Sequence, residues 1–157
     1  MTRRSYALAA AALLTVAGGV AALVILVGGV FGNGKSLTRK EYLDRIQAIC
    51  RTYDRKLQRI PPPANPGNAQ ALAQSIGQAV PLLERRLAEA RKVKPPAKLA
   101  RRVRRAFALA DEAVRDLKTS RSKALAGDAG GAVRAFAQFI GTRDRARQVA
   151  LSIGFTC

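Results

Sequence analysis

The side chains that most often do chemistry in proteins are scarce in this sequence. Histidine is absent, which removes the commonest metal ligand and the only side chain whose unperturbed pKa lies near neutral pH. Asp111, Glu112 and Asp116 lie close together, and Arg115 stands three residues after Glu112, so an ordinary surface ion pair explains them better than a catalytic pair. The sequence holds no glycine-rich phosphate loop, nucleophile elbow or metal-ligand cluster. We therefore expect a non-enzyme that uses no metal and no other cofactor.

The two cysteines, Cys50 and Cys157, are the next candidates. In an exported domain two cysteines indicate one disulfide bond. This bond would close a loop of about 107 residues and stabilise the fold by roughly 4–5 kcal/mol on the chain-entropy model. In a cytosolic domain the same residues would be one buried and one terminal thiol. Zinc binding is not expected, because two cysteines without histidine supply too few ligands.

Positive charge dominates the chain, with 28 Lys and Arg against 10 Asp and Glu and a formal net charge of +18. The densest cluster, called here the basic hairpin, flanks Pro95-Pro96 and has only Glu84 and Glu89 opposing it. It comprises Arg85, Arg86, Arg91, Lys92, Lys94, Lys98, Arg101, Arg102, Arg104 and Arg105. Such a cluster favours anionic partners, either lipid headgroups or wall polymers. The alternatives are a solvated arginine-rich helix face and a coding bias toward arginine. Basic residues elsewhere, Arg143 and Arg147 among them, are assigned no site.

The first 34 residues form a separate region. No charged residue occurs from 5 to 34, and Arg3 and Arg4 precede this run. Its apolar part exceeds the roughly 20 residues that a transmembrane helix needs, and no obvious small-residue cleavage site ends it. We therefore expect an uncleaved signal anchor in residues 1–34, with a cytoplasmic N-terminus, and a second domain in residues 35–157.

The orientation of this anchor depends on two opposing signals. Arg3 and Arg4 place the N-terminus in the cytoplasm by the positive-inside rule, whereas Lys35, Arg39 and Lys40 beyond the anchor favour the reverse. Large domains cross the membrane largely regardless of charge, and the two cysteines favour an oxidising compartment. We expect a single-pass protein of the cell membrane whose C-terminal domain is extracytoplasmic.

Four segments carry apolar residues spaced three and four apart, which predicts helices over 38–60, 69–92, 97–125 and 132–153. No segment alternates with period two, so no sheet is expected. Short proline- and glycine-containing connections make consecutive helices antiparallel neighbours. The predicted fold is therefore all-α: one N-terminal transmembrane helix followed by an up-down four-helix bundle.

Local signals refine these helices. Thr38 and Glu41 have the spacing of a capping box, and Gly154 suits a left-handed helix end. Pro81 lies inside the second helix, so we expect a kink near Gly77 to Pro81 or a break into two segments. Cys50 stands about 18 Å along the first helix at 1.5 Å per residue. For Cys157 to reach it, either the last helix must stop short of the end of the bundle that faces the membrane, or the C-terminal tail must climb back along the first helix. We also expect the first turns of the first helix to project below the bundle.

From Lys35 onward the chain resembles small exported helical domains of high-GC Gram-positive bacteria. The resemblance is carried by segment 42–50, the proline-rich turns, Gly127-Asp128 and the closing residues 154–157. It implies an extracytoplasmic bundle with a cysteine pair, and it implies no activity.

The sequence is compatible with three functions. The first is a membrane-anchored extracytoplasmic interaction or structural module that docks on the envelope surface or on another envelope protein. The second is a cytoplasm-facing, membrane-tethered nucleic-acid binder, favoured by the charge but opposed by the cysteines and by the lack of aromatic residues among the basic ones. The third is a small-ligand carrier with a pocket between helices near Pro81.

Overall fold

The computed structural model describes residues 36–62 and 68–156. The chain divides into two units, 1–35 and 36–157, and only the second is described here. The predicted membrane anchor therefore lies outside the described residues. Within the described ranges, no helix is long and apolar enough to cross a membrane.

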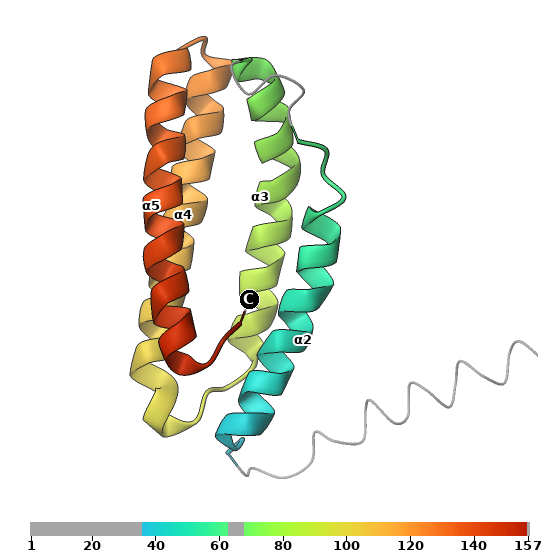
Figure 1. Cartoon of the computed structure of the whole chain (residues 1–157), viewed down its shortest axis with the longest axis vertical. Coiled ribbons are helices and arrows are strands. Elements are labelled where there is room, and N and C mark those ends of the chain that lie inside the picture. Colours follow the sequence, from blue (N-terminus) through green and yellow to red (C-terminus); the bar gives the residue numbers. More distant parts are fainter. Residues whose placement is uncertain (1–35, 63–67, 157) are drawn as a thin grey trace, which may run out of the picture. The chain divides into compact units, whose positions relative to one another are not determined.

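The described residues form helices and no strand, as predicted. Figure 1 shows four α-helices lying side by side and running alternately up and down, compatible with a four-helix bundle. Their bounds are α2, Arg39–Leu57; α3, Ala69–Lys92; α4, Ala100–Leu125; and α5, Ala129–Ile153, with a 3-10 turn, η1, at Ala97–Leu99 before α4. Each predicted helix is confirmed to within a few residues at its ends.

The capping box at the start of α2 is confirmed. The backbone N–H of Thr38 donates to Glu41 Oε2 at 2.8 Å, and the backbone N–H of Glu41 donates to Thr38 Oγ1 at 3.3 Å. At its other end α2 stops at Leu57, three residues before the expected end. The chain then turns through a hydrogen bond from Ile60 N–H to the Leu57 carbonyl before it reaches Pro61, because the residue before a proline disfavours helical backbone.

Helix α3 runs through Pro81 without a break, so the predicted division into two segments is wrong. Pro81 lies on the exposed face of α3, where water can replace the hydrogen bond that its missing N–H would have made to the Gly77 carbonyl. The absence of a side chain on Gly77 makes room for Arg121 of α4, whose Nε would lie 3.0 Å from a Cβ at that position.

The most extensive contact in the bundle joins α4 and α5, and small side chains line it. Ala124 and Ala132 are buried against each other and against Ala73 of α3. The hydroxyl of Ser120, 0% exposed, donates to the Ala132 carbonyl at 2.9 Å. Small residues let two helix backbones approach closely. The alanines of the sequence therefore allow the close contact between α4 and α5, which is called here the α4–α5 seam.

The C-terminal tail turns back along α2. Gly154 ends α5 with φ 105°, the predicted left-handed cap, and Arg39 Nη2 donates to the Ile153 carbonyl at 3.0 Å. Phe155 then packs on Tyr42, and Gln47 Nε2 donates to Thr156 Oγ1. The tail therefore climbs, one of the two routes expected for it, and in Figure 1 the red segment that follows α5 turns back upward.

The first turns of α2 do not project below the bundle, contrary to expectation. Tyr42 is 0% exposed and belongs to a core cluster with Leu99, Ile153 and Phe155. The expectation failed because η1 and the start of α4 reach the same end of the bundle as the first turn of α2 (Figure 1), and Leu99 of η1 lies in one buried cluster with Tyr42.

Candidate functional site: a basic end and an arginine-rimmed groove

The basic hairpin occupies one end of the bundle. Figure 1 shows the α3–α4 connection at the same end as the start of α2, where the chain enters from residue 36. Every basic side chain of the hairpin is exposed except Arg86, which is half-buried. The placement of these residues at one exposed end follows the expected topology.

The two acids beside the basic hairpin have partners elsewhere. Glu84 pairs with Lys118 of α4 at 2.5 Å, and Glu89 accepts a hydrogen bond from the Tyr53 hydroxyl at 2.6 Å, which raises the pKa of Tyr53. Of the ten cations, Arg91 pairs with Asp111 and Arg86 with Asp54, whereas the other eight make no ion pair with any residue in the described ranges. The hairpin thus presents a largely uncompensated positive charge.

Two acidic residues of α4 bind side chains of α5. Glu112 pairs with Arg145 of α5 at 3.2 Å, and Asp116 accepts a hydrogen bond from Thr142 at 2.9 Å. The expected pair between Glu112 and Arg115 does not form. Glu112 and Asp116 instead bind side chains of α5, and these contacts help to fix the register of α4 against α5. Among the described residues no cluster of three metal-ligand side chains occurs.

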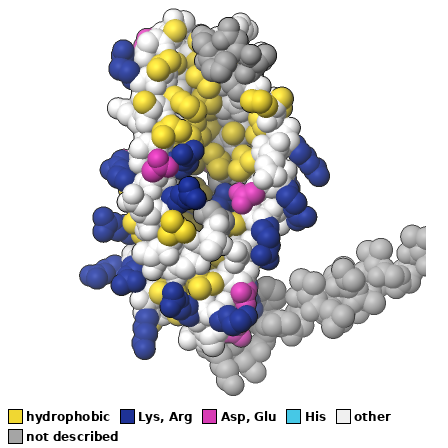
Figure 2. All heavy atoms as spheres, in the orientation of Figure 1, with side chains coloured by type: hydrophobic (Ala, Val, Ile, Leu, Met, Phe, Trp, Pro, Cys, Tyr) yellow, Lys and Arg dark blue, Asp and Glu magenta, His cyan; other side chains and the backbone are white. Residues whose placement is uncertain are grey.

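A groove opens between α2 and α5, which make the sparsest contact around the bundle. It has a volume of about 510 Å³ and is lined by side chains from all four helices. Figure 2 shows hydrophobic side chains exposed in a hollow on the face between α5 and α2. Leu83, Leu87, Phe107 and Phe139 contribute to this wall and are only partly buried. The small-ligand carrier considered above would need a pocket between helices near Pro81. Leu83, which lines this groove, follows that proline by two residues.

The charged residues of the groove lining are three arginines: Arg86, Arg143 and Arg147. Arg86 reaches across from α3, donating to Asp54 Oδ1 at 2.9 Å and to Cys50 Sγ at 3.2 Å. Arg143 pairs with Asp144 at 3.0 Å and lies 5.8 Å over the Phe139 ring. Arg147 makes no ion pair or hydrogen bond with a residue that the structure describes. Among the residues that the structure describes, no carboxylate lines the groove, so the described lining carries only positive charge.

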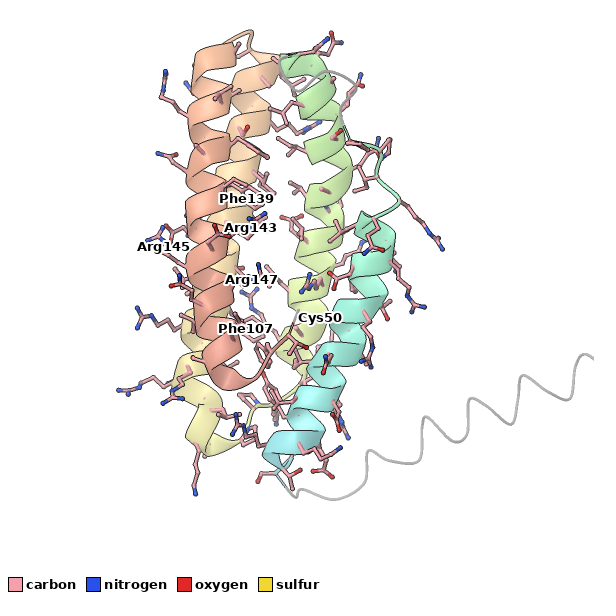
Figure 3. The ribbon with its side chains drawn as sticks, viewed as in Figure 1. Cys50, Phe107, Phe139, Arg143, Arg145 and Arg147 are labelled. Atoms are coloured by element: carbon pink, nitrogen blue, oxygen red, sulfur yellow. The ribbon has the colours of Figure 1, made fainter. Side chains whose placement is uncertain are left out.

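Figure 3 shows that the labelled arginines of α5 lie on two opposite sides of the helix. Arg143 and Arg147 lie on the side of α5 that faces the groove, with Phe139 above them, and Arg145 points away on the opposite side. Residues 139, 143 and 147 are spaced four apart, so they form one stripe along the helix. Sequence reasoning assigned this stripe no site. The spacing of four was the signal available in the sequence. Only the sparse contact between α2 and α5 shows that the stripe faces an opening.

Cys50 lies in the groove wall, 4% exposed, and it is not a free thiol. Its predicted partner, Cys157, lies outside the described residues, so the disulfide stays a prediction. The nearest described residue of the tail, Thr156, contacts Gln47, which precedes Cys50 by less than one helical turn.

Comparison of the chain with family models, curated proteins and solved structures gives no match.

Proposed function

We propose that residues 36–157 are a binding module of the cell envelope, held on the extracytoplasmic side of the membrane by an anchor at 5–34, and that the basic hairpin docks this module on anionic lipid headgroups or wall polymers. One observation carries the proposal. Eight cations without an ion-pair partner in the described ranges gather at the end of the bundle where the chain enters from the anchor. A tether at residue 36 keeps that end close to the surface it would bind.

The energetics favour a surface contact of this kind. Each Lys or Arg near an anionic membrane contributes about 1 kcal/mol, and the contribution falls off within a Debye length of about 8 Å at physiological salt. The rival proposal, nucleic-acid binding, would use aromatic side chains for base stacking. Phe107, two residues after Arg105 of the hairpin, is half-buried, and the guanidinium of Arg91 lies 5.5 Å from the centroid of its ring, so Arg91 covers one face of this ring.

A bond between Cys50 and Cys157 belongs to the same proposal. It fits an oxidising compartment. The course of residues 154–156 supports it, because the tail runs toward Cys50 along α2.

Vesicle binding tests the docking surface. Residues 36–157, checked first for helicity by circular dichroism, should sediment with vesicles rich in acidic lipid, ignore zwitterionic ones, and release as salt rises. The hairpin variant changes Arg101, Arg102, Arg104 and Arg105 to Glu and should lose binding while remaining helical. The control variant changes Arg51, Arg59, Arg115 and Arg134, all exposed and outside any described ion pair, to Glu. Equal loss in both variants would reduce the effect to net charge and reject the hairpin as a site.

Protease treatment of intact wall-stripped cells tests the side of the membrane. The domain should be digested while the N-terminus survives. Protection until the cells are lysed would reject export and favour the nucleic-acid binder.

A further inference from the structure

The groove between α2 and α5 has the size and the wall of a ligand site. Its volume of about 510 Å³ falls within the range of roughly 300–1,000 Å³ typical of small-molecule pockets. Leu87 of α3, Phe107 of α4 and Phe139 of α5 all line this groove, and each of the three side chains is only partly buried. Apolar area left uncovered at the centre of a bundle is a feature that an occupant would remove from water.

Charge selects the occupant. In the part of the chain that the structure describes, the groove combines an apolar wall with guanidinium groups and no acid, so neutral and cationic molecules gain little from its polar part. A guanidinium group stays charged at physiological pH, and its planar set of donors matches the oxygen pairs of carboxylates and phosphates. Arg147 is the guanidinium best able to take such a group, because it has no partner among the residues that the structure describes. Arg143, held by Asp144 and Phe139, stands one turn away.

We propose that this groove binds a single-chain lipid with an anionic head, either a carboxylate or a phosphate monoester. Its acyl chain lies along Leu87, Phe107 and Phe139, and its head group lies at Arg147 and Arg143. Arg86 is a secondary contact, because Asp54 already neutralises it. Arg86 is the only residue of the basic hairpin that lines this groove. The other nine hairpin residues lie outside the groove lining, so the two surfaces can be tested separately.

Photo-crosslinking of the full-length protein tests the site. The protein is placed in nanodiscs of zwitterionic lipid and exposed to three probes that carry a diazirine on a sixteen-carbon chain: a carboxylic acid, an alkyl phosphate and an alcohol. Mass spectrometry then locates the label. The acid, the phosphate or both should label peptides of α3, α4 and α5 that line the groove, and the alcohol should label them far less. Comparison of the two anionic probes identifies the preferred head group.

Matched variants of α5 separate the site from general lipid contact. Arg147→Gln combined with Arg143→Gln should lower groove labelling by about tenfold or more, the loss expected when hydrogen bonds to a charged group are removed. Arg145→Gln is the control, since Arg145 lies on the opposite side of the same helix. Ala110→Phe, at a groove-lining position, should block labelling by filling the cavity. Across a series of competing fatty acids, each added methylene should tighten binding about fourfold until the groove is full.

The outcomes discriminate clearly. Equal labelling by the alcohol and the anionic probes, or labelling unchanged in the double variant, would overturn the proposal. Labelling confined to residues 1–35 would also overturn it, because the probe would then report only the surrounding bilayer. Failure of all three probes would point instead to a protein segment as the occupant and would reject a lipid. The hairpin variant with Arg101, Arg102, Arg104 and Arg105 changed to Glu should label normally, so failure here and failure of membrane docking are distinguishable.

Discussion

Tyr42 on α2 and Phe155 in the tail pack with their ring centroids 6.0 Å apart and their planes tilted by 43°. Both side chains are buried, at 0% and 7% exposure. Offset and tilted aromatic pairs contribute beyond the area they bury. The tail is therefore held to α2 by packing close to Cys50, whether or not a covalent bond is also present.

Phe155→Ala should lower the free energy of unfolding by about 3 kcal/mol, because it removes a buried ring and leaves Tyr42 with an uncovered face. Urea unfolding followed by circular dichroism measures the change. Leu151→Ala, at a position 52% exposed, is the control and should cost much less. A change below about 1 kcal/mol for Phe155→Ala would mean that the tail is not part of the core.

Cys157→Ser should lower the melting temperature under oxidising conditions, with a loss of stability approaching the roughly 4–5 kcal/mol of the chain-entropy model. Reductant should remove the difference between parent and variant. In protein taken from its native compartment, both thiols should resist alkylation until reductant is added. Rapid alkylation of the untreated protein would contradict the bond.

Asp128 links stability to acid pH. Its side chain accepts a hydrogen bond from Gly131 N–H at 2.7 Å at the start of α5, and this bond lowers the pKa of Asp128. A lowered folded-state pKa means that the contribution is present above about pH 4 and is lost as the pH falls through the lowered value. Asp128→Ala should destabilise the protein at pH 7 more than at pH 2.

Asp128→Asn is the informative companion variant, because asparagine keeps the capping acceptor but does not titrate. Its stability should vary less with pH than that of the parent between pH 5 and 2. Parallel pH profiles of the two proteins would show that the Asp128 charge plays no part.

Ser120→Val should cost roughly 1–3 kcal/mol, because extra methyl groups cannot enter the close contact of α4 with α5. Ser120→Ala should cost about 1 kcal/mol, the value of one lost hydrogen bond. Ser122→Val, on the exposed side of α4, is the control and should stay within about 0.5 kcal/mol of the parent. Chemical unfolding of the three variants measures these differences, and equal effects of both valines would argue against a tight seam.

Tyr42 links stability to alkaline pH. Its buried hydroxyl has no hydrogen-bond partner among the described residues, and burial raises the pKa of Tyr42 to about 12. The folded state therefore holds a proton that the unfolded chain loses near pH 10, so this contribution is complete below pH 10 and is lost by about pH 12. Tyr42→Phe should be near-neutral at pH 7 and should flatten the fall in stability between pH 10 and 12.

Tyr53→Phe is the contrasting case, since it removes the hydrogen bond to Glu89 and should weaken the fold at pH 7. Lysine titration is common to all these proteins and cancels in the comparison. An alkaline fall as steep in Tyr42→Phe as in the parent would place the titrating group elsewhere.

Local chemistry predicted the helices well. The Thr38 capping box, the Gly154 cap and the proline turns act through neighbouring atoms, so the sequence carries them directly. Of the two effects predicted for Pro81, the break into two segments did not occur, because Pro81 lies on the exposed face of α3 and that placement is set by packing.

Of the two candidate surfaces, the basic hairpin could be predicted from the sequence and the groove could not. A cluster such as the basic hairpin can be counted along the chain, and a hairpin topology brings it to one end. The Phe139–Arg143–Arg147 stripe has a periodicity that a core face or a solvent face would share. Its role depends on the distance between α2 and α5, which no short-range signal encodes.

The climb of the tail along α2 has a consequence during synthesis. Helix α2 is made first, but Ile153 and Phe155, which cover Tyr42, are made more than a hundred residues later. At typical rates of elongation this interval is on the order of ten seconds. Throughout it the apolar face of α2 can bind a chaperone or a second nascent chain, and the arrival of the tail ends that period of risk.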